Sequence, residues 1–208
     1  MLTHRFITLE GIDGVGKSTH IPFVAQYLID KGFQVTCTRE PGGTRLGEKL
    51  RKILLDPSLP LSLDTETLLI FAARAEHIHQ VIKPALQKGY WVLSDRFTDA
   101  TFAYQGGGHC VAFDRIAALA NWVQQGLIPA LTLLIDIPPN IALARLAPRR
   151  RTDRFEQKSL LFYQRVRETY LDLAKQAPQR FIVIDGQQTI EQTQQEITQR
   201  LNQYFAQQ

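Results

Sequence analysis

Eight consecutive residues near the start of the chain have the types and spacing of a phosphate-binding loop. They read Gly11-Ile12-Asp13-Gly14-Val15-Gly16-Lys17-Ser18 and match G-x-x-x-x-G-K-[ST] at every fixed position. The glycines allow consecutive N–H groups to point at phosphate oxygens, and the N-terminus of a following helix adds its positive end to the same field. The lysine can reach the β- and γ-phosphates, and the Ser18 hydroxyl can bind a magnesium ion. We therefore expect residues 11–18 and Thr19 to bind a nucleoside triphosphate.

Alternating strand and helix signals must position this loop. Short apolar runs predict strands at 5–9, 34–38, 90–94, 131–136 and 180–184. Helical periodicity fills 18–31, 44–55, 65–88, 114–126, 139–146, 156–176 and 189–206. The alternation indicates an α/β fold with a mainly parallel sheet. In such a sheet, chemistry gathers where strands end, at Arg39, Asp95-Arg96, Asp136 and Asp185-Gly186.

Glycine and proline clusters are expected to separate these elements. Loops are predicted at Pro41-Gly42-Gly43, at 56–60 and at Gly106-Gly107-Gly108. We expect one domain over residues 1–208, because 208 residues suffice for a single well-buried core.

Composition and charge restrict the class of protein. With 44% hydrophobic and 21% charged residues, the chain resembles an ordinary soluble globular protein, and its apolar runs are too short to cross a membrane. The N-terminus does not resemble a secretory signal, and two cysteines give no disulfide framework, so we expect a cytoplasmic protein. Cys37, inside a predicted strand, is expected to be a small buried hydrophobe.

The basic balance of the chain favours small anionic substrates over nucleic acid. The formal net charge is +4, but most arginines occur singly rather than in a tail or stripe. The exception is the cluster Arg149-Arg150-Arg151, followed by Arg154.

A phosphate-binding loop alone does not separate a GTPase, an ATPase, a transporter subunit and a small-molecule kinase. The GTPase signature Asn-Lys-x-Asp is absent from the sequence. Two acids at strand ends, Asp95 and Asp136, could steer magnesium directly or through water. Arg96, directly after Asp95, could neutralise a phosphoryl group during transfer.

Five blocks in order make the chain resemble the bacterial thymidylate kinases, which transfer a phosphoryl group from ATP to dTMP. The blocks are residues 11–18, Thr38-Arg39-Glu40-Pro41-Gly42-Gly43-Thr44, Phe71-Ala72-Ala73-Arg74-Ala75-Glu76-His77, Asp95-Arg96 with Ala103-Tyr104-Gln105-Gly106, and 149–156. The resemblance covers about residues 6–185. It implies a P-loop kinase fold, with a five-stranded parallel sheet flanked by helices and a mobile arginine-rich lid at about 147–155. It also implies Mg²⁺ with ATP, held by Ser18 and Asp95, and a homodimer.

The same resemblance assigns residues to dTMP. Arginine supplies the forked, permanently charged donors that an acceptor phosphate needs, and Arg39, Arg51 and Arg96 are the implied clamp. Asp13 is implied near the deoxyribose 3′-hydroxyl and the acceptor phosphate. The base is assigned to Arg74, at thymine O4, and to Thr101 and Gln105 at the N3–C4 edge; Tyr104 crowds the sugar C2′ position. The implied catalytic residues are Lys17, Arg96, Arg149 and Asp13.

The lid is expected to supply charge that the phosphate-binding loop lacks. Some thymidylate kinases carry an arginine between the acid and the second glycine of the loop, where this chain has Gly14. We therefore expect Arg149, with Arg150 or Arg151 as alternatives, to close over ATP and stabilise the transferring phosphoryl group.

The chain departs from the family pattern at Phe97, Ala100 and His109. A further departure concerns the aromatic residue that stacks on thymine, normally four residues before the helix arginine. Ile70 has that spacing here and Phe71 is three before, so either could cover the base, and we favour Phe71. His77 and His79 are expected to be polar helix residues without a role.

Two other classes remain as alternatives. A deoxynucleoside kinase would need a carboxylate base at the 5′-hydroxyl and has less use for three phosphate-clamping arginines. A nucleotide-binding module that switches or binds nucleic acid would hydrolyse ATP slowly without an acceptor.

Overall fold

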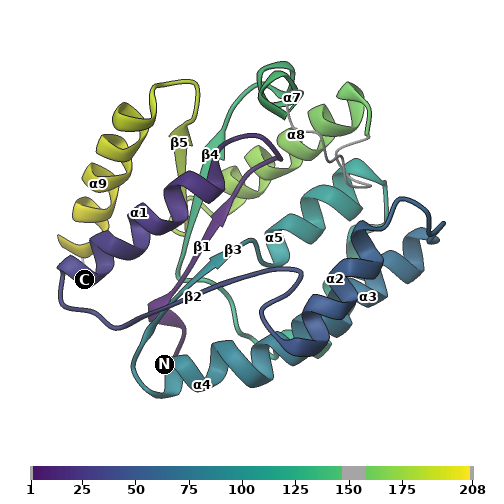
Figure 1. The fold of residues 1–208 in the computed structure, drawn as a ribbon, viewed down its shortest axis with the longest axis horizontal. Helices are drawn as coiled ribbons and strands as arrows, with labels where there is room; N and C mark the ends of the chain where they lie inside the picture. The colour runs from purple at the N-terminus through teal and green to yellow at the C-terminus, as the bar shows by residue number, and fades with distance from the viewer. Residues whose placement is uncertain (1, 147–157, 207–208) are drawn as a thin grey trace.

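The computed structural model describes residues 2–146 and 158–206, which form a parallel five-stranded sheet between two layers of helices (Figure 1). The strands are β1 (Phe6–Glu10), β2 (Val35–Arg39), β3 (Trp91–Asp95), β4 (Leu131–Asp136) and β5 (Phe181–Asp185). Their order across the sheet is β2-β3-β1-β4-β5. This confirms the predicted α/β class and five-stranded parallel sheet, with each strand beginning within one residue of its expected start.

Burial on both faces explains why the three central strands read as continuous apolar runs. All five residues of β1 are buried, including Thr8, whose hydroxyl shares a 2.9 Å hydrogen bond with that of Thr132 on β4. Strand β2 is an edge strand and is only partly covered. Our expectation that Cys37 is buried is wrong for this reason, because Cys37 on β2 is exposed.

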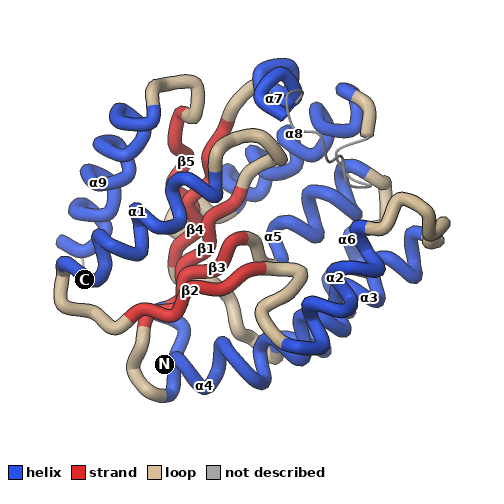
Figure 2. Tube along the Cα trace, in the orientation of Figure 1, coloured by secondary structure: helices blue, strands red, loops and turns tan. Residues whose placement is uncertain are grey.

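Helices cover both faces of the sheet (Figure 2). One layer holds α1 (Lys17–Asp30) and α9 (Ile190–Ala206), which pack on β1–β3 and on β5 respectively. The other side carries α2 (Arg45–Leu55), α3 (Leu63–His77), α4 (Lys83–Gln87), α5 (Thr98–Thr101), α6 (Phe113–Gln124) and α8 (Leu160–Gln176) (Figure 2). Helix α7 (Pro139–Leu146) follows β4 beside the phosphate-binding loop.

The helix predicted over 65–88 is present, but its hydrogen-bond pattern changes part of the way along. A wide π-helical turn, Ile78–Ile82, joins α3 to α4. Pro84 lies just beyond it and has no N–H to donate to the preceding turn. The wider turn accommodates this missing donor, because irregular turns commonly form next to proline.

The prediction of a loop at Gly106-Gly107-Gly108 is wrong. These residues end a π-helical segment, Phe102–Gly108, that continues from α5. A Cβ at Gly107 would overlap the hydroxyl of Thr169 on α8, and a Cβ at Gly108 would overlap the ring of Phe162. The glycines therefore serve close packing between this segment and α8.

The sheet order brings three strand ends to one place. Leu9 of β1 lies beside Asp95 of β3, and Arg39 of β2 lies on the other side of Asp95. The phosphate-binding loop, Asp95-Arg96 and Arg39 consequently share one edge of the sheet. No helix within the described ranges is long and apolar enough to span a membrane.

Candidate active site

The phosphate-binding loop adopts a backbone that only glycine accommodates at two of its positions. Gly11 has φ 136°, and a Cβ there would lie 2.5 Å from the carbonyl oxygen of Ile135 on β4. Gly14 has φ 86°, and its Cβ would overlap the carbonyl oxygen of Ala142 on α7. The loop is thus pressed between β4 and α7.

Lys17 begins α1 and folds back over the loop. Its Nζ donates to the carbonyl oxygens of Gly11 (3.0 Å) and Ile12 (3.1 Å). Burial, and next the positive charge of Arg96, lower the pKa of Lys17 to about 8. An anion at the loop would reverse this shift, so the site favours a ligand that supplies negative charge.

Arg96 follows β3 and reaches across to the phosphate-binding loop. Its Nη2 donates to Asp13 Oδ1 (2.6 Å) and to the Tyr104 hydroxyl (2.9 Å), and its Nη1 donates to the Tyr170 hydroxyl (3.1 Å). Its guanidinium carbon lies 4.6 Å from the centre of the Tyr104 ring. These contacts fix a cation beside the loop with only 13% of its side chain exposed.

Asp13 is held in its charged form by the cations around it. Burial opposes this, but Arg96 and then Lys17 outweigh burial and hold the pKa of Asp13 below its usual range. The Tyr104 hydroxyl donates to its second oxygen, Oδ2, at 2.9 Å. The structure thus brings together three predicted site residues, Asp13, Arg96 and Tyr104.

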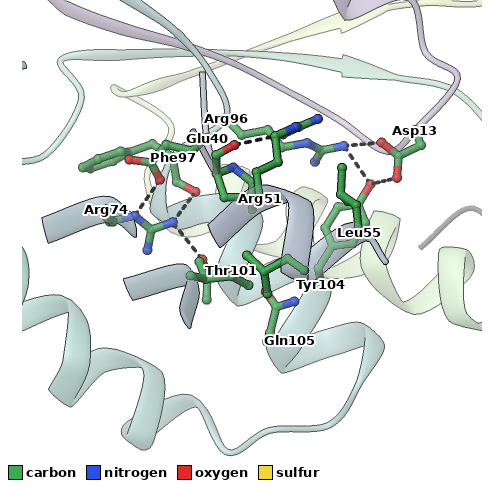
Figure 3. Close-up of a pocket in the computed structure, with 14 residues that line it drawn as sticks. Asp13, Glu40, Arg51, Leu55, Arg74, Arg96, Phe97, Thr101, Tyr104 and Gln105 are labelled. Carbon is green, nitrogen blue, oxygen red and sulfur yellow. Dashed lines mark hydrogen bonds and ion pairs between the residues drawn. The ribbon is translucent and has the colours of Figure 1, made fainter. Parts of the chain in front are cut away.

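A cavity opens beside these residues, and we call it the α3–α5 cavity after two of the helices around it (Figure 3). It is lined from several elements: Asp13, Glu40, Pro41, Arg51, Leu54, Leu55, Ile70, Arg74, Arg96, Phe97, Ala100, Thr101, Tyr104 and Gln105. Five of these residues are charged, namely Asp13, Glu40, Arg51, Arg74 and Arg96, while Ile70, Leu54 and Ala100 supply apolar surface. Such a lining suits a flat, partly polar ring joined to an anionic group.

Arg74 is buried in the wall of this cavity and is held at two of its three nitrogens. Its Nε donates to Glu40 Oε2 (2.7 Å), and its Nη2 donates to the Phe97 carbonyl oxygen (3.2 Å) and the Thr101 hydroxyl (2.9 Å). Its Nη1 has no protein partner among the described residues. A buried donor without a partner suits a carbonyl oxygen of a ligand.

The carboxylate of Glu40 connects Arg74 to a buried histidine that our sequence reasoning left without a role. His77 Nδ1 donates to Glu40 Oε1 (2.9 Å), and its Nε2 shares a 2.6 Å hydrogen bond with the Thr38 hydroxyl. Burial raises the pKa of Glu40, but Arg74 and His77 outweigh burial and hold it below its usual range. The pattern of a histidine three residues after Arg74 gave no signal of this, because its partner lies 37 residues away.

The structure favours Ile70 over Phe71 as the apolar surface of the cavity. Ile70 lines the cavity, whereas Phe71 does not and packs instead with Val111 and Ile116. Phe71 still lies under the guanidinium of Arg74, 4.7 Å from its ring centre. Our preference for Phe71 as the residue that covers the base therefore lacks support here.

Gln105 also lines the cavity, and the nitrogen of its amide group is engaged. Its Nε2 donates to Glu66 Oε1 at 2.9 Å, and Glu66 is fully buried. A carboxylate can only accept at this contact, so the amide group turns its nitrogen toward Glu66.

A second cavity surrounds the phosphate-binding loop and adjoins the first. Its lining includes Gly14, Gly16, Lys17, Ser18, Arg39, Asp95 and Leu146. Four further residues line both cavities: Asp13, Glu40, Arg51 and Arg96. Arg39 is more loosely held than Arg96, since its contact with Glu48 (2.9 Å) lies at the surface. The junction of the two cavities thus holds two arginines, Arg51 and Arg96, together with two carboxylates, Asp13 and Glu40.

The residues of the loop cavity fit a magnesium ion that is held mainly by phosphate oxygens. Asp95 Oδ1 is buried without a hydrogen-bond partner in the described part of the chain, and Asp95 and Ser18 line the same cavity. Three-residue clusters of histidine, cysteine and carboxylate do not occur among the described residues, but Mg²⁺ commonly uses only one or two protein ligands. The other candidate, Asp136, is bound by Arg167 through two hydrogen bonds of 2.7 and 2.8 Å.

Part of the predicted site lies outside the described residues, and two residues beside the site were not predicted from the sequence. Arg149, Arg150 and the lid at 147–155 lie outside the described residues. Sequence reasoning missed Glu10, although a lone carboxylate at the end of a buried strand just before a phosphate-binding loop is a recognisable signal. It also missed Tyr170, which lies in the regular pattern of a helix and carries no such signal.

The parallel sheet, the loop between β1 and α1, and the arginines at the neighbouring strand ends define the chain as a P-loop kinase. A family model for thymidylate kinase matches residues 9–197. The chain belongs to the thymidylate kinase family.

The similarity of this chain to known thymidylate kinases extends over nearly its whole length. The chain is 55% identical to a thymidylate kinase of Chromobacterium violaceum over 193 residues, covering 93% of this chain and 91% of the relative. It is 58% identical to a thymidylate kinase of Cupriavidus metallidurans over 188 residues, covering 90% and 92%. A crystal structure of thymidylate kinase from Ehrlichia chaffeensis superposes with a TM-score of 0.77 at 36% identity, covering 95% and 97%.

Proposed function

We propose that the protein phosphorylates dTMP to dTDP with ATP as donor. The observation that carries this proposal is the junction of the two cavities at Asp13, Arg51 and Arg96. A triphosphate on the loop and a monophosphate in the α3–α5 cavity would meet at that junction. Membership of the thymidylate kinase family selects thymidylate among the monophosphates that the cavity could hold.

Phosphoryl transfer at this junction needs positioning and charge more than proton transfer. An oxygen of the dTMP phosphate, already anionic, bonds to the γ-phosphorus while the bond from that phosphorus to the β–γ bridging oxygen breaks. Lys17 and Arg96 stabilise the charge on the transferring group, and Arg39 and Arg51 hold the acceptor phosphate. Magnesium, held by Ser18 and Asp95 with the ATP phosphates, would add positive charge there.

The α3–α5 cavity supplies recognition of the nucleoside. Arg74 Nη1 donates to thymine O4, and Gln105 and Thr101 face the N3–C4 edge, while Ile70 covers the face of the base in place of Phe71. Asp13 accepts from the 3′-hydroxyl. Tyr104, fixed by Asp13 and Arg96, crowds C2′ and disfavours a ribose.

The lid completes the donor site in this proposal. Arg149, or one of its neighbours Arg150 and Arg151, closes over ATP and neutralises the transferring phosphoryl group. The support is the sequence, which has an arginine cluster between two helices and a glycine at position 14. Replacement of all three arginines by alanine is expected to lower kcat by about a thousandfold; a loss of less than tenfold would refute the role.

We also propose that the protein is a cytoplasmic homodimer. Helices α3 and α6 pack against each other and both expose large apolar side chains, including Leu68 (54% exposed) and Trp122 (77% exposed). Such a surface suits association with a second copy. Sedimentation of the purified protein should give twice the chain mass, and Trp122→Lys should give the single-chain mass; a monomeric wild type would refute the dimer.

The test of function is steady-state ADP release from Mg·ATP with a panel of acceptors. The panel is dTMP, dUMP, ribosyl-TMP, thymidine and no acceptor, with each product identified by mass. We expect fast turnover with dTMP, slower turnover with dUMP and little with the others. Turnover on thymidine, or hydrolysis that needs no acceptor, would refute the proposal.

A further inference from the structure

Glu10 is a fully buried carboxyl group that no step of the proposed reaction uses. It is the last residue of β1, immediately before the phosphate-binding loop. Its Oε1 accepts from the Phe97 backbone N–H (2.7 Å), and the Tyr170 hydroxyl donates to its Oε2 (2.7 Å). Both partners adjoin Arg96: Phe97 follows it in the chain, and Tyr170 contacts its side chain.

The first contact fixes the backbone of Arg96, which is strained. Arg96 has φ 72°, in the left-handed region that side chains other than glycine rarely adopt. Its own N–H donates to the Leu9 carbonyl oxygen (3.1 Å), and the next N–H donates to Glu10. Two successive residues of β1 therefore hold the two amides on either side of the strained Cα. A strained residue keeps one conformation only where its surroundings hold it in this way.

The second contact fixes the side chain. The Tyr170 hydroxyl accepts from Arg96 Nη1 (3.1 Å) and donates to Glu10. Tyr170 is 1% exposed, and its position on α8 is set by packing in the main core. Asp13 and Tyr104 bind Nη2 of Arg96, and Tyr170 binds Nη1. The guanidinium group is therefore held at both of its terminal nitrogens.

We propose that Glu10 and Tyr170 are positioning residues that hold Arg96 in the conformation that binds the phosphate of the acceptor. Glu10 acts on both the backbone and, through Tyr170, the side chain of Arg96. The inference rests on the proposed function, because it assigns the phosphate of the acceptor to Arg96. It adds two residues from β1 and α8 that line neither cavity.

The test compares a ligand that carries the phosphate with one that lacks it. Dissociation constants for dTMP and thymidine are measured by calorimetry without ATP, so that catalysis plays no part. Tyr170→Phe removes only the hydroxyl and should weaken dTMP binding by about fivefold to tenfold, with thymidine binding unchanged within twofold. Glu10→Leu should do the same or more, and Glu10→Gln should restore most of the affinity, since an amide can both accept and donate.

A matched control removes another buried hydroxyl. Thr193 is a buried residue on α9, and its hydroxyl donates to the Asp185 carbonyl oxygen; Thr193→Val should leave the ratio of the two dissociation constants unchanged. In an Arg96→Ala background, Tyr170→Phe should cause no further loss of dTMP affinity, because its effect passes through Arg96.

The outcomes separate this inference from the proposed function. Equal weakening of dTMP and thymidine, or an unchanged dTMP affinity in Tyr170→Phe, would overturn the positioning role while the function stands. A further loss of dTMP affinity in the Arg96→Ala background would also overturn it. A wild type that binds thymidine as tightly as dTMP would overturn the phosphate site, and both proposals with it.

Discussion

Arg96 and Asp13 are 83 residues apart in the chain, yet Arg96 Nη2 lies 2.6 Å from Asp13 Oδ1. The contact joins the end of β3 to the phosphate-binding loop. A side chain assigned to the acceptor is therefore fastened to the loop assigned to the donor. Under the proposed function, one connected group of residues would position both substrates.

Asp13→Asn should lower kcat/KM for dTMP by about tenfold to a hundredfold, because Arg96 loses its charged partner and a buried pair is costly to break. The measurement is steady-state kinetics with dTMP varied at saturating ATP. Glu48→Gln is the control, because the pair that Glu48 forms with Arg39 is largely exposed and should contribute little. Equal losses in the two variants would contradict this reading.

The affinity for ATP should fall as the pH rises above 8. The pKa of Lys17 is about 8 without ligand, and phosphates nearby should raise it, so binding takes up a proton at higher pH. Above pH 8, affinity should drop by up to about tenfold per pH unit. Calorimetry at pH 8.5 in two buffers of different ionisation enthalpy measures the proton uptake. Lys17→Met should bind weakly and lack that uptake.

Glu40→Gln should lower the free energy of unfolding by about 3 kcal/mol, because Arg74 would keep its charge without a buried partner. The folded pKa of Glu40 lies below its unfolded value, so its contribution is present above pH 4.5 and lost as pH falls through the folded pKa. Urea unfolding at pH 7 measures the loss, and thymidine affinity should fall as Arg74 moves. The control is Glu76→Gln, because Glu76 is on the same helix as Arg74 but does not contact Glu40 or Arg74. It should change neither the stability nor the thymidine affinity by much.

Gly107→Ala should destabilise the fold by about 1–3 kcal/mol, because the added methyl group overlaps the Thr169 hydroxyl. Thr169→Ala removes that hydroxyl and should restore part of the loss. The measurement is a double-mutant cycle by urea unfolding. Additive losses would show that Thr169 is not the obstacle.

Stability should also depend on pH through Glu10. Burial, and next the negative charge of Asp99, raise the pKa of Glu10 to about 8, above its unfolded value of 4.5. The folded state therefore binds the proton more tightly, and this stabilisation is full below pH 4.5 and lost as pH rises towards 8. When protonated, the carboxyl group can donate to Tyr170 instead of accepting. Relative to Glu10→Gln, the wild type should lose stability between pH 5 and pH 8; parallel curves would contradict the raised pKa.

The sheet was predictable because its strands are short apolar runs in the sequence. The central strands are apolar along their whole length because helices cover both faces of the sheet. Cys37 was misjudged because nothing within Val35–Arg39 distinguishes an edge strand from a central one. The glycines at 106–108 were misjudged for a related reason. Glycine is equally typical of a loop and of close helix packing, and only the partner helix α8 decides between them.

The charged residues of the site were predictable where a local pattern carries them, as in residues 11–18 and Asp95-Arg96. The supporting contacts were not. Glu10 depends on Tyr170, 160 residues away, and Glu40 depends on His77. Such partners are chosen by the fold, and a single sequence contains no spacing that links them.

The packing of Gly14 limits where this chain could carry an arginine next to the bound phosphates. An arginine at position 14 would need a Cβ where the Ala142 carbonyl oxygen lies, in a backbone conformation of φ 86°. Helix α7 would have to withdraw before a side chain of any kind could occupy that position. A move of the proposed lid arginine to position 14 would therefore require a repacked helix α7 as well as a new residue.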